Sequence, residues 1–115
     1  MTIKDLMNTL QARLLTPDTD VTREVHHACG SDMMSDVLAY VKDQAVLVTG
    51  LNNPQVVRTA DMMDMVCVVF VRAKQPDDML LQMAAERGIA VLSSEMTMFT
   101  ACGLLYAAGL RGGAK

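Results

Sequence analysis

The sequence has no tryptophan and only two tyrosines and two phenylalanines in 115 residues. Its ten lysines and arginines are outnumbered by 13 aspartates and glutamates, and they are scattered along the chain. A nucleic-acid-binding surface needs a basic face or aromatic side chains on which bases can stack. The composition therefore predicts that nucleic acid is not a partner.

Long apolar runs are also missing. The longest lies near Val66–Val71, far short of the roughly 20 residues that a membrane-spanning helix needs. The first residues, Met1–Leu6, include an acidic side chain where a secretion signal would be apolar. We therefore expect no membrane association and a cytoplasmic location.

Cysteine is scarce, and the three residues Cys29, Cys67 and Cys102 are too far apart and odd in number for a disulfide framework. Cys67 and Cys102 are expected to be reduced core thiols. His27 and Cys29 would project from one face of a strand, within reach of one metal ion. No third or fourth ligand follows at a recognisable spacing, so a redox or metal accessory role for a partner enzyme is kept as the alternative function.

Motifs of the common enzyme classes are absent. No Gly-x-x-x-x-Gly-Lys-Ser/Thr or Gly-x-Gly-x-x-Gly pattern follows any expected strand, and no Gly-x-Ser-x-Gly pattern occurs. These absences exclude a P-loop kinase, a classical dinucleotide enzyme and a serine hydrolase. The sequence predicts no catalytic residue, no bound metal and no cofactor.

The most informative stretch that is present covers residues 45–60. The apolar run Ala45–Val48 reaches a turn at Gly50, after which Asn53 can cap a helix and Pro54 can occupy its first position. A buried strand, a tight turn and a capped helix are the unit of parallel α/β sheets. With 51% hydrophobic residues and a mass of 12.5 kDa, residues 1–115 are expected to form one domain with one core.

The apolar periodicity predicts five helices and four strands in alternation. The helices are expected at Thr2–Leu15, Asp32–Gln44, Pro54–Met63, Pro76–Gly88 and Met98–Gly109. The strands are expected at Val21–Cys29, Ala45–Thr49, Val66–Val71 and Ile89–Leu92, and residues 110–115 are expected to fray. Strands joined through helices run parallel, which predicts a three-layer α/β/α sandwich with a mainly parallel sheet of about four strands.

Methionine is abundant, with eleven residues clustered near helix ends and loops. The periodicity places Met33 and Met79 on the inward faces of their helices. Methionine fills irregular gaps in cores and also suits adaptable contact surfaces. Both a core role and an oligomer interface remain open for these residues.

Polar loops follow all four expected strands, and ligands of open parallel sheets bind beyond the carboxyl ends of the strands. The loops combine hydroxyls, amides and two cations, which suits a small anionic ligand such as a phosphorylated one. The candidate ligand-binding residues are Ser31, Asp32, Thr49, Gly50, Asn52, Asn53, Arg72, Lys74, Ser93, Ser94 and Thr97. The alternative is that these residue types serve only as helix caps and turns.

Six stretches, in this order and spacing, carry a family resemblance: Thr2–Leu6, Asp20–Val25, Ser31–Leu38, Leu47–Arg58, Val69–Lys74 and Gly88–Ser94. The chain resembles the small stand-alone DRTGG-domain proteins, which are similar to the N-terminal domain of HPr kinase/phosphorylase. Comparable modules accompany CBS domains and phosphotransacetylases. A literal Asp-Arg-Thr-Gly-Gly string is absent, and Thr49-Gly50 in the matching loop is followed by Leu51-Asn52-Asn53.

The resemblance implies an α/β/α fold and a non-catalytic regulatory or ligand-sensing role. It supplies no established catalytic residues. Short members of this family are often encoded near iron-only hydrogenases, which implies a hydrogenase-related protein partner. We expect the chain to work as a homo-oligomer, the simplest form being a homodimer.

Overall fold

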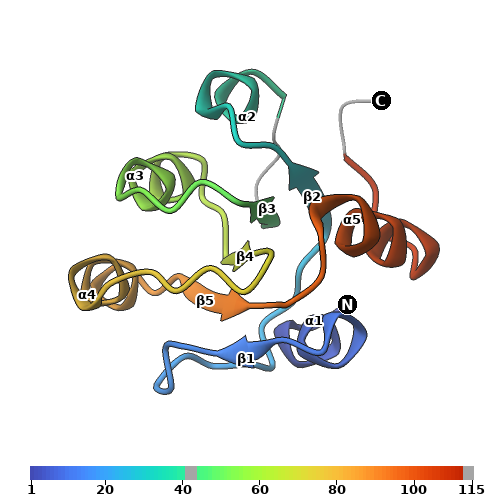
Figure 1. Cartoon of the computed structure of the whole chain (residues 1–115), viewed down its shortest axis with the longest axis horizontal. Coiled ribbons are helices and arrows are strands. Elements are labelled where there is room, and N and C mark those ends of the chain that lie inside the picture. The colour runs from blue at the N-terminus through green and yellow to red at the C-terminus, as the bar shows by residue number, and fades with distance from the viewer. Residues whose placement is uncertain (41–43, 113–115) are drawn as a thin grey trace.

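The computed structural model describes residues 1–40 and 44–112, and in it one five-stranded sheet lies between two layers of helices (Figure 1). The helices are α1 (Ile3–Leu10), α2 (Met34–Tyr40), α3 (Gln55–Met62), α4 (Asp78–Glu86) and α5 (Met98–Ala107). The strands are β1 (Arg13–Leu14), β2 (His27–Gly30), β3 (Ala45–Thr49), β4 (Cys67–Phe70) and β5 (Ala90–Ser93). Their spatial order is β1-β5-β4-β3-β2, with β2 to β5 parallel and β1 antiparallel.

Every residue of β3, β4 and β5 is buried, because helices cover both faces of the sheet. One face, which carries Val46 and Val48, packs against α1 and α5. The opposite face, which carries Leu47 and Phe70, packs against α2, α3 and α4. The prediction of a three-layer α/β/α sandwich with a mainly parallel sheet is confirmed.

The first helix is shorter than predicted. Thr2 and Asp5 form a capping box at its start, but Gln11 adopts a left-handed conformation (φ 49°) and ends the helix after Leu10. The next residues, Arg13–Leu14, pair with β5 and add a fifth strand that the sequence analysis missed. A two-residue strand is too short to show any periodicity.

The predicted strand Val21–Cys29 is wrong in its first part, since β2 begins at His27. The backbone before it is used elsewhere: the carbonyls of Val21 and Arg23 accept the N–H groups of Lys4 and Ile3 at 2.9 and 3.0 Å. This segment therefore satisfies the free amides at the start of α1 and does not pair with the sheet.

The tail predicted to fray from Leu110 is packed over its described residues. Leu110 is buried, and the N–H of Ala28 donates to the carbonyl of Arg111 at 3.0 Å along the free edge of β2. The expectation is thus wrong for residues 110–112, while residues 113–115 lie outside the described residues. The predicted end of the second helix, at residues 42–44, also falls largely outside them.

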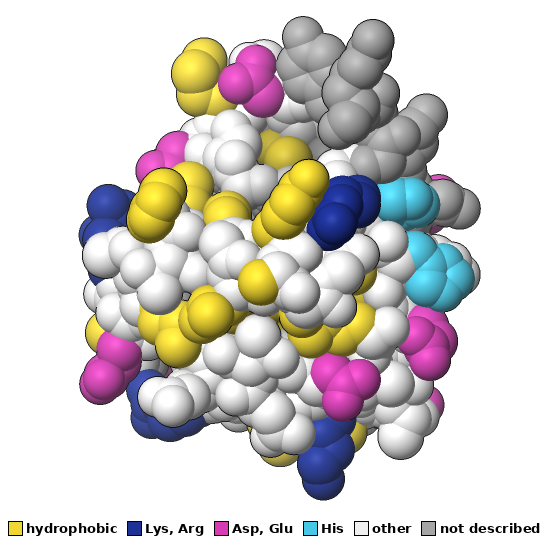
Figure 2. Space-filling view, turned by 90° about the vertical axis from the view of Figure 1, so that its right-hand side faces the viewer, with side chains coloured by type: hydrophobic (Ala, Val, Ile, Leu, Met, Phe, Trp, Pro, Cys, Tyr) yellow, Lys and Arg dark blue, Asp and Glu magenta, His cyan; other side chains and the backbone are white. Residues whose placement is uncertain are grey.

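Several apolar side chains point outward. Met33 and Met79 are 61% and 69% exposed, so the prediction that they are buried is wrong, and Leu80 takes the inward position at the start of α4. Figure 2 shows further hydrophobic side chains on the side of the molecule that carries α5. No helix among the described residues is long and apolar enough to cross a membrane.

Two buried threonines give a matched test of this packing. The hydroxyl of Thr16 accepts the N–H of Val91 at 3.0 Å, whereas the hydroxyl of Thr59 has no hydrogen-bond partner among the described residues. We expect Thr16→Val to lower the free energy of unfolding by about 1–3 kcal/mol, because it leaves a buried amide unpaired. Thr59→Val should raise it by about 1 kcal/mol, because it removes an unpaired hydroxyl.

Urea denaturation followed by circular dichroism measures both changes. The substitution is the same at both positions and both side chains are buried, so a common effect of exchanging hydroxyl for methyl cancels. Equal losses of stability in the two variants would contradict the hydrogen-bonding pattern described here.

Candidate functional site

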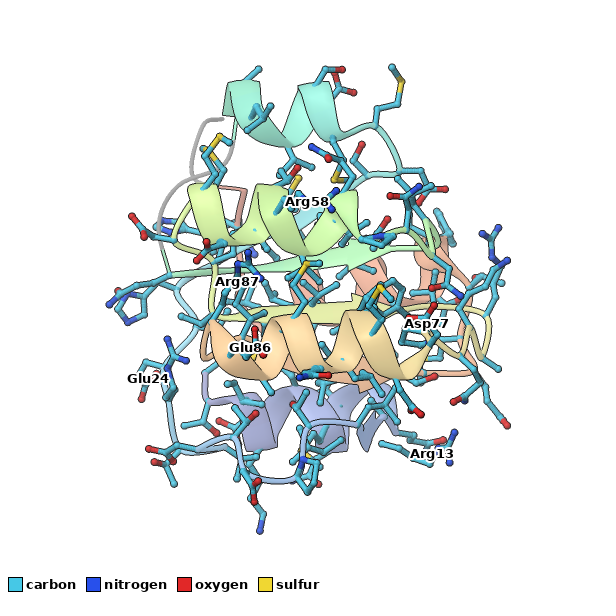
Figure 3. All side chains as sticks on the ribbon, turned by 90° about the vertical axis from the view of Figure 1, so that its left-hand side faces the viewer. Arg13, Glu24, Arg58, Asp77, Glu86 and Arg87 are labelled. Atoms are coloured by element: carbon cyan, nitrogen blue, oxygen red, sulfur yellow. The ribbon has the colours of Figure 1, made fainter. Side chains whose placement is uncertain are left out.

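The four polar loops that follow β2, β3, β4 and β5 lie at one edge of the sheet, because these strands are parallel. We call this edge the rim, formed by residues 31–33, 50–53, 71–77 and 94–97. Figure 3 places Arg13 and Asp77 toward this end of the molecule and Glu86 and Arg87 toward the opposite end. The expectation that the exit loops share one edge is confirmed.

Two neighbouring exit loops leave the rim in opposite directions. The loop after β4 leads to α4, on the face covered by α2 and α3, whereas the loop after β5 leads to α5 on the other face (Figure 1). Open α/β sheets bind ligands at such a topological switch point. A hollow of about 310 Å³ lies there, lined by Gln11, Arg13, Ala73, Ser93 and Glu95.

The loop after β4 has an unusual backbone. Arg72 and Ala73 are both left-handed, with φ of 56° and 57°, a conformation that costs residues other than glycine on the order of 1–2 kcal/mol each. Their N–H groups donate to the carbonyls of Met96 and Ser94, both at 2.8 Å. The loop after β5 therefore holds the loop after β4 in a strained shape, as is often seen at functional sites.

Gly50 gives the Arg72 side chain its position. A methyl group added at Gly50 would overlap the Arg72 guanidinium at Nη2 and lie 3.1 Å from its Cζ. Arg72 and Lys74 are both exposed, and the structure gives the two charged groups no hydrogen bond or ion pair within the described part of the chain. Two cations are therefore available at the rim.

The carboxylate of Asp32 binds the hydrogen-bond donors at the end of β3 that an anionic ligand would otherwise use. Its Oδ1 accepts the N–H of Gly50 at 2.7 Å and the hydroxyl of Thr49 at 2.9 Å. The amide and hydroxyl donors of this loop therefore already serve a carboxylate of the chain itself. The positive charge that remains available comes from the loop after β4.

Most other candidate residues make hydrogen bonds to the exit loops, to α1, or to the first turns of α3 and α5. These residues are Ser31, Asn52, Asn53, Ser93, Ser94 and Thr97. Ser94, for example, is buried and donates to the carbonyl of Leu10 at 2.8 Å. The alternative of caps and turns accounts for the hydrogen bonds of these side chains.

Two charged residues that line the hollow are not among the residues predicted from the sequence. Arg13 comes from β1, where it pairs with Ser93, and Glu95 follows β5. Arg13 could not be identified because the strand that carries it gives no sequence signal. Arg13 is thus the cation in the lining of the hollow, whereas Arg72 and Lys74 belong to the adjoining loop and the Arg72 guanidinium lies against Gly50.

The His27–Cys29 pair lies on β2, and both side chains are half-buried. No group of three or more potential metal ligands occurs among the described residues. Burial raises the pKa of the Cys29 thiol, and the nearby Cys102 and Asp36 raise it further. A protonated thiol is a poor metal ligand, so these features do not favour the alternative function.

Comparison with known proteins identifies the same kind of fold. A family model described as "DRTGG domain" matches residues 5–108. Among solved structures, the chain is similar to the CBS and DRTGG domains of the regulatory region of Clostridium perfringens pyrophosphatase, whose crystal contained the activator diadenosine tetraphosphate. The TM-score is 0.75 at 14% identity, and the match covers 90% of this chain and 45% of that one, less than half its length. None of the curated proteins matches the chain.

The strained turn after β4 yields a stability prediction. Ala73→Gly should raise the free energy of unfolding by about 1 kcal/mol, because glycine adopts the left-handed conformation without a steric penalty. The control Ala85→Gly, at an exposed position in α4, should lower it by about 1 kcal/mol. Urea denaturation measures both, and a loss of stability in Ala73→Gly would contradict the backbone conformation.

The thiols yield a prediction about pH. Burial raises the pKa of Cys29, Cys67 and Cys102, so less thiolate is present at a given pH than in the unfolded chain. Alkylation by iodoacetamide near neutral pH, followed by mass spectrometry, should be slow at Cys29 and Cys102 and absent at the buried Cys67. Unfolding allows the thiols to ionise, so they contribute a loss of folding stability as the pH rises above about 8.5. Rapid alkylation of Cys29 would contradict the raised pKa of its thiol and would support metal binding at this position.

Proposed function

The chain belongs to the DRTGG-domain family, and from this premise we propose that it is a non-catalytic regulatory module that binds a small anionic ligand at the rim. The observation that carries the proposal is the hollow between the loops after β4 and β5, with Arg13 in its lining and the exposed Arg72 and Lys74 on either side of its lining residue Ala73 in sequence. It lies where the connections of adjacent parallel strands diverge, which is the preferred ligand position in open α/β sheets.

The chemistry of the rim supports an anion that also carries hydrogen-bond donors. Arginine is well suited to phosphate because its planar guanidinium can donate two parallel hydrogen bonds. The carboxylate of Glu95, which lines the hollow, can accept from hydroxyl or amino groups of the same ligand. A phosphorylated metabolite or a nucleotide combines both features.

The similar structure supports the same ligand class. The regulatory region of the pyrophosphatase was crystallised with diadenosine tetraphosphate, a nucleotide rich in phosphate. We extend to this chain the class of ligand, a nucleotide or another phosphorylated compound. The switch-point geometry of the rim and its exposed cations are the grounds for placing such a ligand here.

The proposal has three further parts. The module works as a homo-oligomer, acts on a hydrogenase-related protein partner, and is located in the cytoplasm. The partner rests on the short family members encoded near iron-only hydrogenases. The location is supported by three cysteines without disulfides among the described residues.

A thermal-shift screen with inorganic phosphate, nucleotides and phosphorylated metabolites tests the ligand proposal, because a ligand of the folded state raises the melting temperature. We expect Arg72→Ala, Lys74→Ala and Arg13→Ala each to weaken the binding of a ligand found in this screen by about 10- to 100-fold. Arg58→Ala is the matched control, since Arg58 is an exposed arginine in the middle of α3 that neither belongs to the rim nor lines the hollow (Figure 3).

Gly50→Ala is a more selective variant. Gly50 does not have a positive φ, so alanine adds no backbone strain, and only the Arg72 side chain must move. We expect stability close to that of the unchanged chain but a loss of affinity similar to that of Arg72→Ala, measured by isothermal titration calorimetry. No binding by the unchanged chain, or equal binding by all these variants, would contradict the proposed rim site.

A further inference from the structure

Helix α5 has an outward face that is apolar and uncharged. None of its ten residues, Met98–Ala107, is charged, and Phe99, Tyr106 and Leu104 are 89%, 62% and 37% exposed. Hydrophobic side chains form a broken band across this side of the molecule in Figure 2. A group of exposed large apolar side chains on one uncharged helix is a candidate interaction surface. At 89% exposure, the Phe99 side chain makes little contact within the protomer.

Gly103 lies in the middle of this face. Its backbone is helical and its φ is not positive, and nothing lies within 4 Å of the position that a Cβ atom would take. Glycine weakens a helix relative to alanine, and no contact within the protomer requires it here. A second helix could cross α5 closely at this point, because glycine has no side chain to keep the two backbones apart.

The charges at the two ends of α5 complement each other. Glu95 precedes the helix and Arg111 follows it, both are exposed, and Gly103 lies midway between them in sequence. The Arg111 guanidinium is held in place, 3.8 Å from the centre of the Tyr106 ring and hydrogen-bonded to the Tyr106 carbonyl at 2.9 Å. In an antiparallel contact centred on Gly103, each Glu95 would meet Arg111 of the partner subunit.

We infer that α5 is the interface between two copies of this chain, with a two-fold axis near Gly103. The inference rests on the proposed homo-oligomer and names its surface. An uncharged patch can face itself without repulsion, as a two-fold interface requires. Phe99 and Tyr106 alone would bury on the order of 300 Å² per copy, below the roughly 800 Å² per copy of a standard interface, so we expect a weak dimer that forms only at high concentration.

Sedimentation velocity of the full chain from about 1 to 200 μM tests the inference, since this range brackets a micromolar dissociation constant. The unchanged chain should pass from monomer to dimer. Gly103→Leu should leave the protomer folded, because its side chain projects into open space, and should raise the dimer dissociation constant at least about tenfold. Phe99→Ser should act alike. Met79→Ser is the control, since Met79 is also a largely exposed apolar residue (69%) but lies on α4, and it should leave the dimer unchanged.

The position of the axis is tested by cross-linking with diamide, which takes up the two thiol hydrogens as a disulfide forms. Gly103→Cys should yield a covalent dimer, whereas Met79→Cys should not. A monomer over the whole concentration range overturns both the interface and the homo-oligomer. A dimer that persists in Gly103→Leu and is not cross-linked through Gly103→Cys overturns the α5 interface and leaves the homo-oligomer standing. Ligand binding by the Gly103→Leu monomer tests the rim independently.

Discussion

The parallel hydrogen bonding of β2 to β5 is the constraint on which the rest of the structure depends. Parallel strands must be joined by crossovers, so helices cover both faces and the strands are buried. The same pairing brings the ends of four strands to one edge. The core and the position of the rim are therefore two results of one arrangement of the backbone.

The architecture could be predicted because its signals are long and repeated. The apolar runs at Ala45–Thr49 and Val66–Val71 agree with β3 and β4, and the helix starts expected at Thr2 and Pro76 fall within two residues of those of α1 and α4. The missed features depend on tertiary contacts. Arg13–Leu14 is a strand only because β5 offers an edge, and residues 21–25 are irregular because their carbonyls pair with the start of α1. The periodicity of apolar residues within a short segment cannot indicate either of these tertiary contacts.

The candidate site could be predicted as a set of loops but not residue by residue. Residue type cannot distinguish Ser94, which is buried against the Leu10 carbonyl, from Arg72, which is exposed beside Gly50. Residue type also gives no sign that the Asp32 carboxylate already accepts a hydrogen bond from the N–H of Gly50. Nor does it show that Arg13, on the antiparallel edge strand, lines the hollow. These differences depend on which side chains meet across the rim.

The segment Ser93–Thr97 has two structural roles. It lines the hollow through Ser93 and Glu95, and it ends at Thr97, whose hydroxyl caps the first turn of α5. The proposed ligand site in the hollow and the proposed interface on α5 are therefore connected through one short loop. Thermodynamic linkage is reciprocal, so if assembly changes the affinity of the hollow for its ligand by some factor, the ligand changes the strength of assembly by the same factor. The output of such a sensor would then be its own state of association.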